Sequence, residues 1–327
     1  MVDCMDRSHG MKYVFGPVPS RRLGRSLGID TVPLKTCNWN CVYCQLGRSM
    51  PVVSESREYL PRDEILVEVQ KALQSMPPPD IDWVTFVASG EGTLHHRIGE
   101  MVQAVKTMSP FPIAIITNGS LLDQPAIREK LSVADAVLPT LDAGSPDLFR
   151  QINRPHSHFT FARHVAGLTA FANMPRHAKL WIEVMLVAGL NDTESALREL
   201  AAVLADIGPD EVHLTLPTRC PAEKWVHPPD AESLARVQAI LGPIARLTSK
   251  SELVLTLSRT GVLEDQIINI VSRHPLRLEE LKLAAQEVTG LDFRSVLDKL
   301  CTAGKVQVIE RFGTLFVAGV PATSHSR

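Results

Sequence analysis

Short apolar runs alternate with longer amphipathic stretches along most of this chain. The apolar runs predict strands over residues 26–34, 82–88, 112–118, 135–141, 179–187 and 211–216. Apolar residues at helical spacing predict helices over residues 61–76, 95–108, 124–131, 159–173, 193–207 and 230–248. The strands are mostly apolar on both faces, which is typical of parallel strands covered on both sides. The pattern therefore predicts an α/β fold with six βα units, and it does not distinguish a barrel from an open sheet.

The pattern changes after residue 258. Two helical stretches cover residues 263–274 and 278–290, and a third helix, an Ala303-Gly304 turn and two short strands follow. This order predicts a small winged-helix-like domain over residues 259–327, which would bind nucleic acid or pack against a partner. Its basic and acidic residues are balanced, so charge does not decide between these roles. Residues 1–11 are expected to form a flexible tail, which leaves residues 12–258 as the main domain.

Composition narrows the class of protein. The 327 residues include 45% hydrophobic and 21% charged residues, and the formal net charge is -2. These values exclude a disordered or fibrous protein and give the whole chain no attraction for nucleic acid or anionic lipid. The N-terminal segment lacks the apolar region of a secretion signal, and no window is long enough to span a membrane. We therefore expect a cytoplasmic protein without a membrane partner, whose six cysteines are reduced thiols.

Three of these cysteines form the strongest local signal. Cys37, Cys41 and Cys44 have C-x3-C-x2-C spacing directly after the first predicted strand. Zinc requires a fourth ligand, but Cys220 is distant in the sequence and no histidine lies nearby. Three thiolates can instead hold an iron–sulfur cubane and leave one iron open to a small molecule. An incomplete zinc loop, or three unrelated cysteines, is the alternative.

The cysteine motif and its place in the chain resemble the radical S-adenosylmethionine (SAM) superfamily. The resemblance implies a partial (βα)6 TIM-like barrel, with a [4Fe-4S] cluster and SAM as cofactors. It also implies that the reduced cluster cleaves SAM to a 5′-deoxyadenosyl radical, which abstracts hydrogen from a substrate. Tyr43, before the third cysteine, corresponds to a residue near the adenine. Residues 15–47 look like a subgroup related to the wyosine-synthase-like iron–sulfur oxidoreductases.

The resemblance also suggests residues that contact SAM. The Ser89, Gly90 and Glu91 segment follows the second predicted strand and resembles the element that holds the methionine amino group. We expect further cofactor contacts at the ends of later strands, from Thr117 and Asn118, from Asp142, and from Asn191 through backbone groups. Each position also has a plain structural interpretation as a turn or a helix cap.

Several charged residues are candidates for substrate binding. Arg21 and Arg22 precede the first predicted strand, and Arg154 lies in an Asn-Arg-Pro-His segment. Arginines at such sites can hold a carboxylate or phosphate with two hydrogen bonds, although a solvated surface or a helix end would also explain them. Glu183 lies in an apolar strand, so it must be paired or face the barrel interior.

The substrate and the electron donor are less defined by the sequence. The family resemblance favours a tRNA base as substrate, with a peptide or small metabolite as alternatives, and a flavodoxin- or ferredoxin-like protein as the one-electron reductant. Two other functions remain open at this point. One is a cluster- or zinc-bearing regulator that binds nucleic acid through the C-terminal domain, and the other is a structural zinc protein.

Overall fold

The main domain is built on one curved sheet of eight strands. The computed structural model describes residues 11–76, 80–248, 253–257, 261–289 and 292–320. The strands are hydrogen-bonded in chain order, with β1 antiparallel to β2 and all later neighbours parallel. Their bounds are β1 (Val14–Ser20), β2 (Gly24–Ile29), β3 (Trp83–Val87), β4 (Ile113–Thr117), β5 (Ala136–Pro139), β6 (Lys179–Met185), β7 (Glu211–Thr215) and β8 (Ala245–Leu247).

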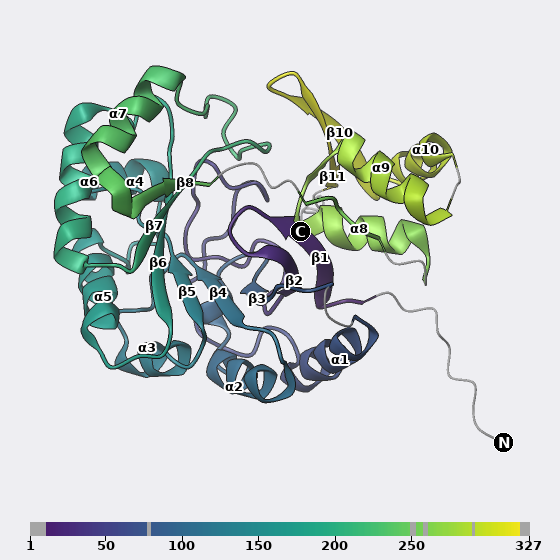
Figure 1. Ribbon diagram of the computed structural model, residues 1–327, viewed down its shortest axis with the longest axis horizontal. Helices are drawn as coiled ribbons and strands as arrows, with labels where there is room; N and C mark the ends of the chain where they lie inside the picture. The colour runs from purple at the N-terminus through teal and green to yellow at the C-terminus, as the bar shows by residue number, and fades with distance from the viewer. Residues whose placement is uncertain (1–10, 77–79, 249–252, 258–260, 290–291, 321–327) are drawn as a thin grey trace.

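Helices cover the outer face of this sheet, as in a TIM barrel (Figure 1). They are α1 (Arg62–Ser75), α2 (Ile98–Met108), α3 (Pro125–Leu131), α4 (Pro146–Asn153), α5 (Phe161–Asn173), α6 (Glu194–Ile207) and α7 (Ala231–Leu241), with short 3-10 helices at Gly92–Leu94 and Gly242–Ile244. None of the helices within the described ranges is long and apolar enough to cross a membrane.

Strand β6 shows how the sequence produces the two faces of the sheet, one packed against the helices and the other lining the cavity. Leu180, Ile182 and Val184 are fully buried in the large apolar core that the strands share with the helices. The alternate residues Glu183 and Met185 line the inner cavity. Because strand residues alternate between faces, one strand supplies both the core and the wall of a site. Glu183 therefore faces the barrel interior, as its isolation in an apolar strand predicted.

The predicted α/β architecture is confirmed, with differences at three places. A seventh parallel strand, β8, lies where the helix over residues 230–248 was predicted to continue, because Gly242-Pro243 ends α7 at Leu241. The antiparallel strand β1 and the short helix α4 were not predicted. Both are too short, or too interrupted by glycine and proline, to give a clear hydrophobic period.

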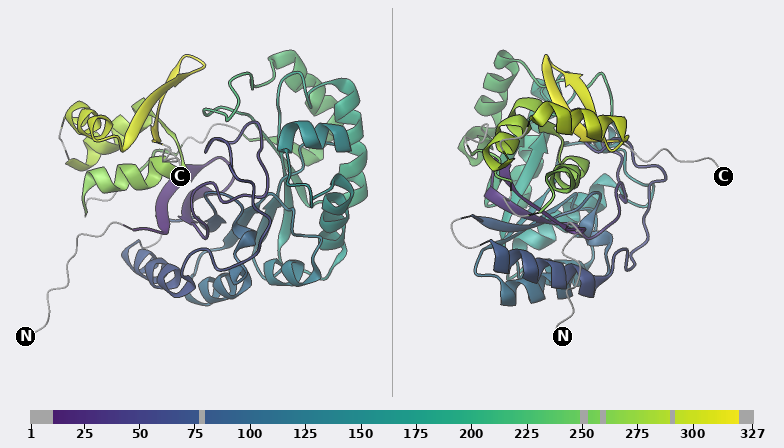
Figure 2. Two further views of the ribbon diagram at one scale, coloured as in Figure 1. Left: turned by 180° about the vertical axis from the view of Figure 1, so that it is seen from behind. Right: turned by 90° about the vertical axis from the view of Figure 1, so that its right-hand side faces the viewer.

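The C-terminal elements form a second, smaller unit beside β1 (Figures 1 and 2). In chain order they are α8 (Leu263–Arg273), β9 (Leu276–Arg277), α9 (Leu278–Thr289), α10 (Phe293–Thr302), β10 (Val306–Arg311) and β11 (Thr314–Gly319). The three strands form an antiparallel sheet in the order β10-β11-β9. Phe15 and Val18 of β1 are buried in the apolar core of this unit, so it packs directly on the barrel. The predicted boundary at 258/259 and residues 1–10 of the tail predicted over residues 1–11 lie outside the described residues. Met11 is described and is partly buried against the barrel core.

Candidate active site

The three motif cysteines lie in a loop that follows β2 at the carboxyl end of the parallel strands. Backbone hydrogen bonds tie this loop to the end of α4, from Asn40 N to Asn153 O (3.1 Å) and from Val42 N to Ile152 O (2.9 Å). Trp39, 1% exposed, packs edge-on against Phe149 of α4 with ring centroids 5.1 Å apart. The unpredicted helix α4 therefore fixes the position of the loop.

All three cysteines line one cavity of about 370 Å³ inside the barrel. Burial raises the pKa of each thiol, and the pKa of Cys41 is raised further by the carboxylate of Asp142 and by the other two cysteines. Without a bound metal, the buried thiols keep their protons. Metal binding would release these protons.

The donor set fits an iron–sulfur cluster. Three soft sulfur ligands share one cavity, and two side-chain amides point at their sulfurs, Asn118 Nδ2 at Cys37 Sγ (3.9 Å) and Asn153 Nδ2 at Cys41 Sγ (3.7 Å). Within the described ranges no three His, Cys, Asp or Glu side chains converge on a point where they would hold a single metal ion. A cubane does not require this convergence, because each thiolate binds a different iron.

The Ser89–Glu91 segment packs directly against the cysteine loop. Lys35 N donates to Ser89 O (2.6 Å), and Glu91 N donates to Thr36 O (2.8 Å). A Cβ atom at Gly90 would lie 1.9 Å from Thr36 O, so only glycine permits this approach. The segment thus holds the backbone immediately before Cys37.

The Glu91 carboxylate joins the ends of two strands. It accepts hydrogen bonds from Thr93 N (2.9 Å) and Thr93 Oγ1 (2.6 Å), from Thr117 Oγ1 (2.7 Å) and from Asn118 N (2.6 Å). Asn118 Nδ2 also donates to Asn38 Oδ1 (2.6 Å), within the cysteine loop. These bonds fix the end of β4 relative to the loop after β3.

Asp142 is the centre of a second polar network in the cavity wall. It is 1% exposed and accepts hydrogen bonds from Tyr43 OH (2.6 Å), Asn153 Nδ2 (2.6 Å) and Met185 N (2.7 Å). Burial raises the pKa of Asp142 to about 6, while these hydrogen bonds limit the rise. Asn191 supports the network from behind by donating to the backbone oxygen of Asp142 (2.8 Å).

Most of the site residues predicted from the sequence are brought together in this cavity. Besides the cysteines, its lining includes Arg21, Arg22, Tyr43, Ser89, Gly90, Glu91, Thr117, Asn118 and Asp142. Arg22 forms an ion pair with Glu183, which supplies the partner that this carboxylate required. Two predicted residues lie elsewhere: Asn191 sits behind Asp142 and is 1% exposed, and Arg154 forms an ion pair with Glu223.

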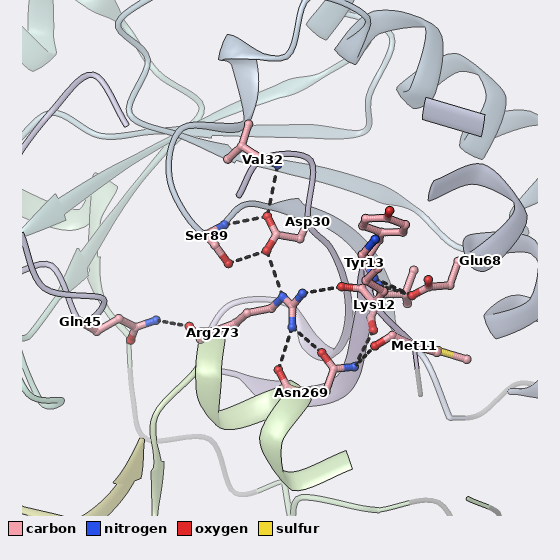
Figure 3. Close-up of polar contacts among 11 residues, drawn as sticks. Met11, Lys12, Tyr13, Asp30, Val32, Gln45, Glu68, Ser89, Asn269 and Arg273 are labelled. Atoms are coloured by element: carbon pink, nitrogen blue, oxygen red, sulfur yellow. Dashed lines mark hydrogen bonds and ion pairs between the residues drawn. The ribbon is translucent and has the colours of Figure 1, made fainter. Parts of the chain in front are cut away.

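The sequence analysis missed a group of cavity residues contributed by later parts of the chain. Arg219 follows β7, and Arg273 and His274 end α8, yet all three line the same cavity as the cysteines. Arg273 also reaches Asp30 at the end of β2, which holds Ser89 (Figure 3). No periodic pattern or motif marks these residues, because they come together only through packing of the C-terminal unit on the barrel.

Comparison with known proteins identifies the family to which the chain belongs. Residues 31–204 match the sequence model of the Radical SAM superfamily. The chain belongs to the radical SAM superfamily. It is 33% identical over 311 residues to a UPF0026 protein of Methanocaldococcus jannaschii, covering 94% of this chain and 95% of that one. It is 32% identical over 301 residues to a UPF0026 protein of Helicobacter pylori (strain 26695), covering 91% and 96%.

A solved structure shows the same fold at lower identity. A radical SAM methyltransferase from Sphaerobacter thermophilus superposes with a TM-score of 0.53 and 18% identity, over 68% of this chain and 66% of that one. The radical SAM protein described here is an enzyme, and a [4Fe-4S] cluster and SAM are the cofactors that its superfamily uses. Enzymes of this superfamily need an external reductant.

Proposed function

We propose that Cys37, Cys41 and Cys44 each bind one iron of a [4Fe-4S] cluster, and that the fourth iron binds SAM. The observation that carries this proposal is the lining of one cavity by all three thiols together with most of the residues expected to contact SAM. When bound, the cluster supplies the electron that cleaves SAM, and the resulting 5′-deoxyadenosyl radical abstracts hydrogen from the substrate. The protein positions both cofactors and keeps water from the reactive carbon.

Different residues of the chain position the cluster and SAM. Asn118 and Asn153 donate to the cysteine sulfurs, and the Ser89–Glu91 segment offers backbone groups to the methionine amino group of SAM. Because the Glu91 carboxylate already accepts four hydrogen bonds, its first role is to hold Thr117 and Asn118 at the cavity wall. Tyr43, Asp142 and, through Asp142, Asn191 complete the wall on the side of the adenine and ribose.

We further propose that residues 12–258 form the catalytic domain and residues 259–327 a winged-helix-like domain. The order of helices and strands after residue 262, with a three-stranded antiparallel sheet, supports the second assignment. A flavodoxin- or ferredoxin-like protein is the proposed electron donor. Radical chemistry is compatible with a tRNA base, a peptide or a small metabolite as the substrate. It is also compatible with assignment of the chain to the wyosine-synthase-like subgroup.

The cluster assignment is tested by Cys41→Ala, with Cys301→Ala of α10 as the matched control. Each variant is reconstituted anaerobically with iron and sulfide, reduced, and incubated with SAM. We expect Cys41→Ala to lose the iron–sulfur absorbance and the release of 5′-deoxyadenosine, and Cys301→Ala to keep both. Retention of 5′-deoxyadenosine release by Cys41→Ala would reject the assignment. A nucleic-acid regulator would instead show specific nucleic-acid affinity and no SAM cleavage.

A further inference from the structure

The cavity that holds the cysteines also holds a group of basic side chains from three separate parts of the chain. Arg21 and Arg22 follow β1, Arg219 follows β7, and His274 follows α8, and all four line the cavity. Arg273 lines the cavity as well but is paired with Asp30. The guanidinium groups of Arg21, Arg22 and Arg219 in one cavity repel one another and lose hydration. This arrangement costs stability unless negative charge compensates it.

Arg219 has only neutral partners within the described residues. Its guanidinium donates to Gln45 Oε1 (3.0 Å) and to His274 Nε2 (2.5 Å). A guanidinium has no acceptor, so His274 Nε2 must accept and the imidazole is neutral, with its proton on Nδ1. Burial and the neighbouring Arg219 hold the pKa of His274 well below its usual range, which agrees with a neutral ring. Burial lowers the pKa of Arg219 to about 9, so it still carries its charge at pH 7.

Arg21 also has a neutral hydrogen-bond partner. Its guanidinium donates to Thr218 Oγ1, and in the described part of the chain it forms no ion pair with a carboxylate. Burial lowers its pKa, and Arg277 lowers it further, while Glu280 acts in the opposite direction. Thr218 and Arg219 line the same cavity as Arg21, and the charge of Arg21 lowers the pKa of Arg219.

The charges around this part of the cavity do not balance among the described residues. Arg22 is paired with Glu183, and Arg277 lies 3.9 Å from Glu280. Among the described residues, the carboxylate whose charge acts on Arg21 and Arg219 is that of Glu280, which is paired with Arg277. Glu91 and Asp142 also line the cavity, but their carboxylates are engaged in the hydrogen-bond networks described above. Arg21 and Arg219 remain as two positive charges without a negative partner, both facing the cavity.

Resting on the proposed function, we infer that Arg21 and Arg219 bind the phosphate group of a small phosphorylated substrate. A phosphate monoester carries about -1.5 to -2 charges at pH 7, which matches the two unpaired guanidinium groups. Its oxygens accept the paired hydrogen bonds that arginine donates. Neutral His274 holds Arg219 in place and contributes no competing charge.

The charge also argues against two other occupants. SAM has one carboxylate, which would leave one of the two guanidinium groups uncompensated. An RNA phosphodiester likewise carries one negative charge, so an RNA strand would have to bring two separate phosphates into the cavity to compensate both arginines. A dianionic monoester on a small molecule satisfies both arginines at once, next to the cavity where the radical forms.

The inference is tested by binding of inorganic phosphate to the full-length chain, without reductant. Isothermal titration calorimetry at constant ionic strength is performed on the wild type, Arg21→Gln, Arg219→Gln and the exposed control Arg198→Gln of α6. We expect the wild type and Arg198→Gln to bind phosphate, and each cavity variant to bind at least about tenfold more weakly, since it loses charge-assisted hydrogen bonds. Without phosphate, the melting temperature of Arg219→Gln should equal or exceed that of the wild type, because an uncompensated charge has been removed.

Three results would overturn the inference. The first is phosphate binding that is absent from the wild type or unchanged in both cavity variants. The second is tighter binding of malonate than of phosphate by the wild type. Loss of SAM binding by the two cavity variants, while they still bind phosphate, would count in the same way. The third is binding of an RNA oligonucleotide more tightly than ribose 5-phosphate, with dependence on the same two arginines. Because no measurement requires SAM cleavage, failure here is distinguishable from failure of the proposed radical chemistry.

Discussion

Arg273, the last residue of helix α8, forms an ion pair with Asp30 at the end of strand β2, with 3.0 Å between Nε and Oδ2 (Figure 3). Asp30 also accepts hydrogen bonds from Ser89 N (2.9 Å) and from Ser89 Oγ. One carboxylate therefore joins the C-terminal unit to the segment that packs on the cysteine loop. The side chain of Asp30 is only 4% exposed, so its charge depends on these partners.

Arg273→Gln should lower both stability and SAM affinity. Breaking a buried ion pair by removing one partner leaves Asp30 uncompensated, and we expect the free energy of unfolding to fall by about 3 kcal/mol. Urea denaturation measures this change, and equilibrium dialysis measures SAM binding by the reconstituted protein. The exposed pair of Arg25 and Asp82 provides the control, since Arg25→Gln should cost less than about 1 kcal/mol. Equal effects of the two variants would show that Arg273 makes no special contribution.

Gly90→Ala should prevent formation of the cluster site. The added Cβ would lie 1.9 Å from Thr36 O, so the cysteine loop would have to move away from β3. We expect loss of most bound iron after reconstitution, measured by iron and sulfide analysis. At Gly208 (φ +64°) an added Cβ meets nothing within 4 Å, so Gly208→Ala should cost only about 1 kcal/mol of backbone strain and keep its iron. A full iron complement in Gly90→Ala would contradict the close packing described here.

Asn153→Ala should make the reduction potential of the cluster more negative. Asn153 Nδ2 lies 3.7 Å from Cys41 Sγ, and hydrogen bonds to ligand sulfur favour the more electron-rich reduced state. A bond worth about 1 kcal/mol corresponds to a shift of about 40 mV for one electron. A redox titration followed by electron paramagnetic resonance measures the potential. An unchanged or more positive value would exclude this role for Asn153.

The buried histidine of α5 should make stability depend on pH. His164 Nε2 bonds to Thr140 O (2.9 Å), and burial lowers the pKa of His164 to about 4, from 6.5 for the free side chain. The unfolded chain therefore binds more protons than the folded chain between pH 6.5 and 4, and stability falls as pH falls through this window. From pH 7 to pH 5, the stability advantage of the wild type over His164→Gln should shrink by about 2 kcal/mol. Urea denaturation of both proteins at the two pH values tests this, and a constant difference would contradict it.

The sequence was sufficient for the features that follow from periodicity and short motifs. All the parallel strands except β8 were predicted from apolar runs, and the cysteine loop, Gly90 and Asp142 were placed at strand ends. Carboxyl ends of parallel strands meet at one edge, which explains why most of these residues, although distant in sequence, line one cavity. The roles assigned to these residues remain predictions.

Contacts between different parts of the chain could not be predicted in this way. Arg219 lies in an irregular loop, and Arg273 and His274 end a helix of the C-terminal unit. Their approach to the cavity depends on how α8 packs against β1, which leaves no periodic signal in the sequence. Helix α4 was missed because it has only eight residues, from Pro146 to Asn153, and is ended by Arg154, whose φ of +45° is unusual outside glycine.

The placement of Arg273 and His274 in the cavity wall has a consequence for biosynthesis. The ribosome releases the barrel strands and the cysteine loop before α8 emerges, so the pocket stays open on one side while the last part of the chain is being made. Arrival of α8 then adds Arg273 and His274 to the wall and completes the cavity.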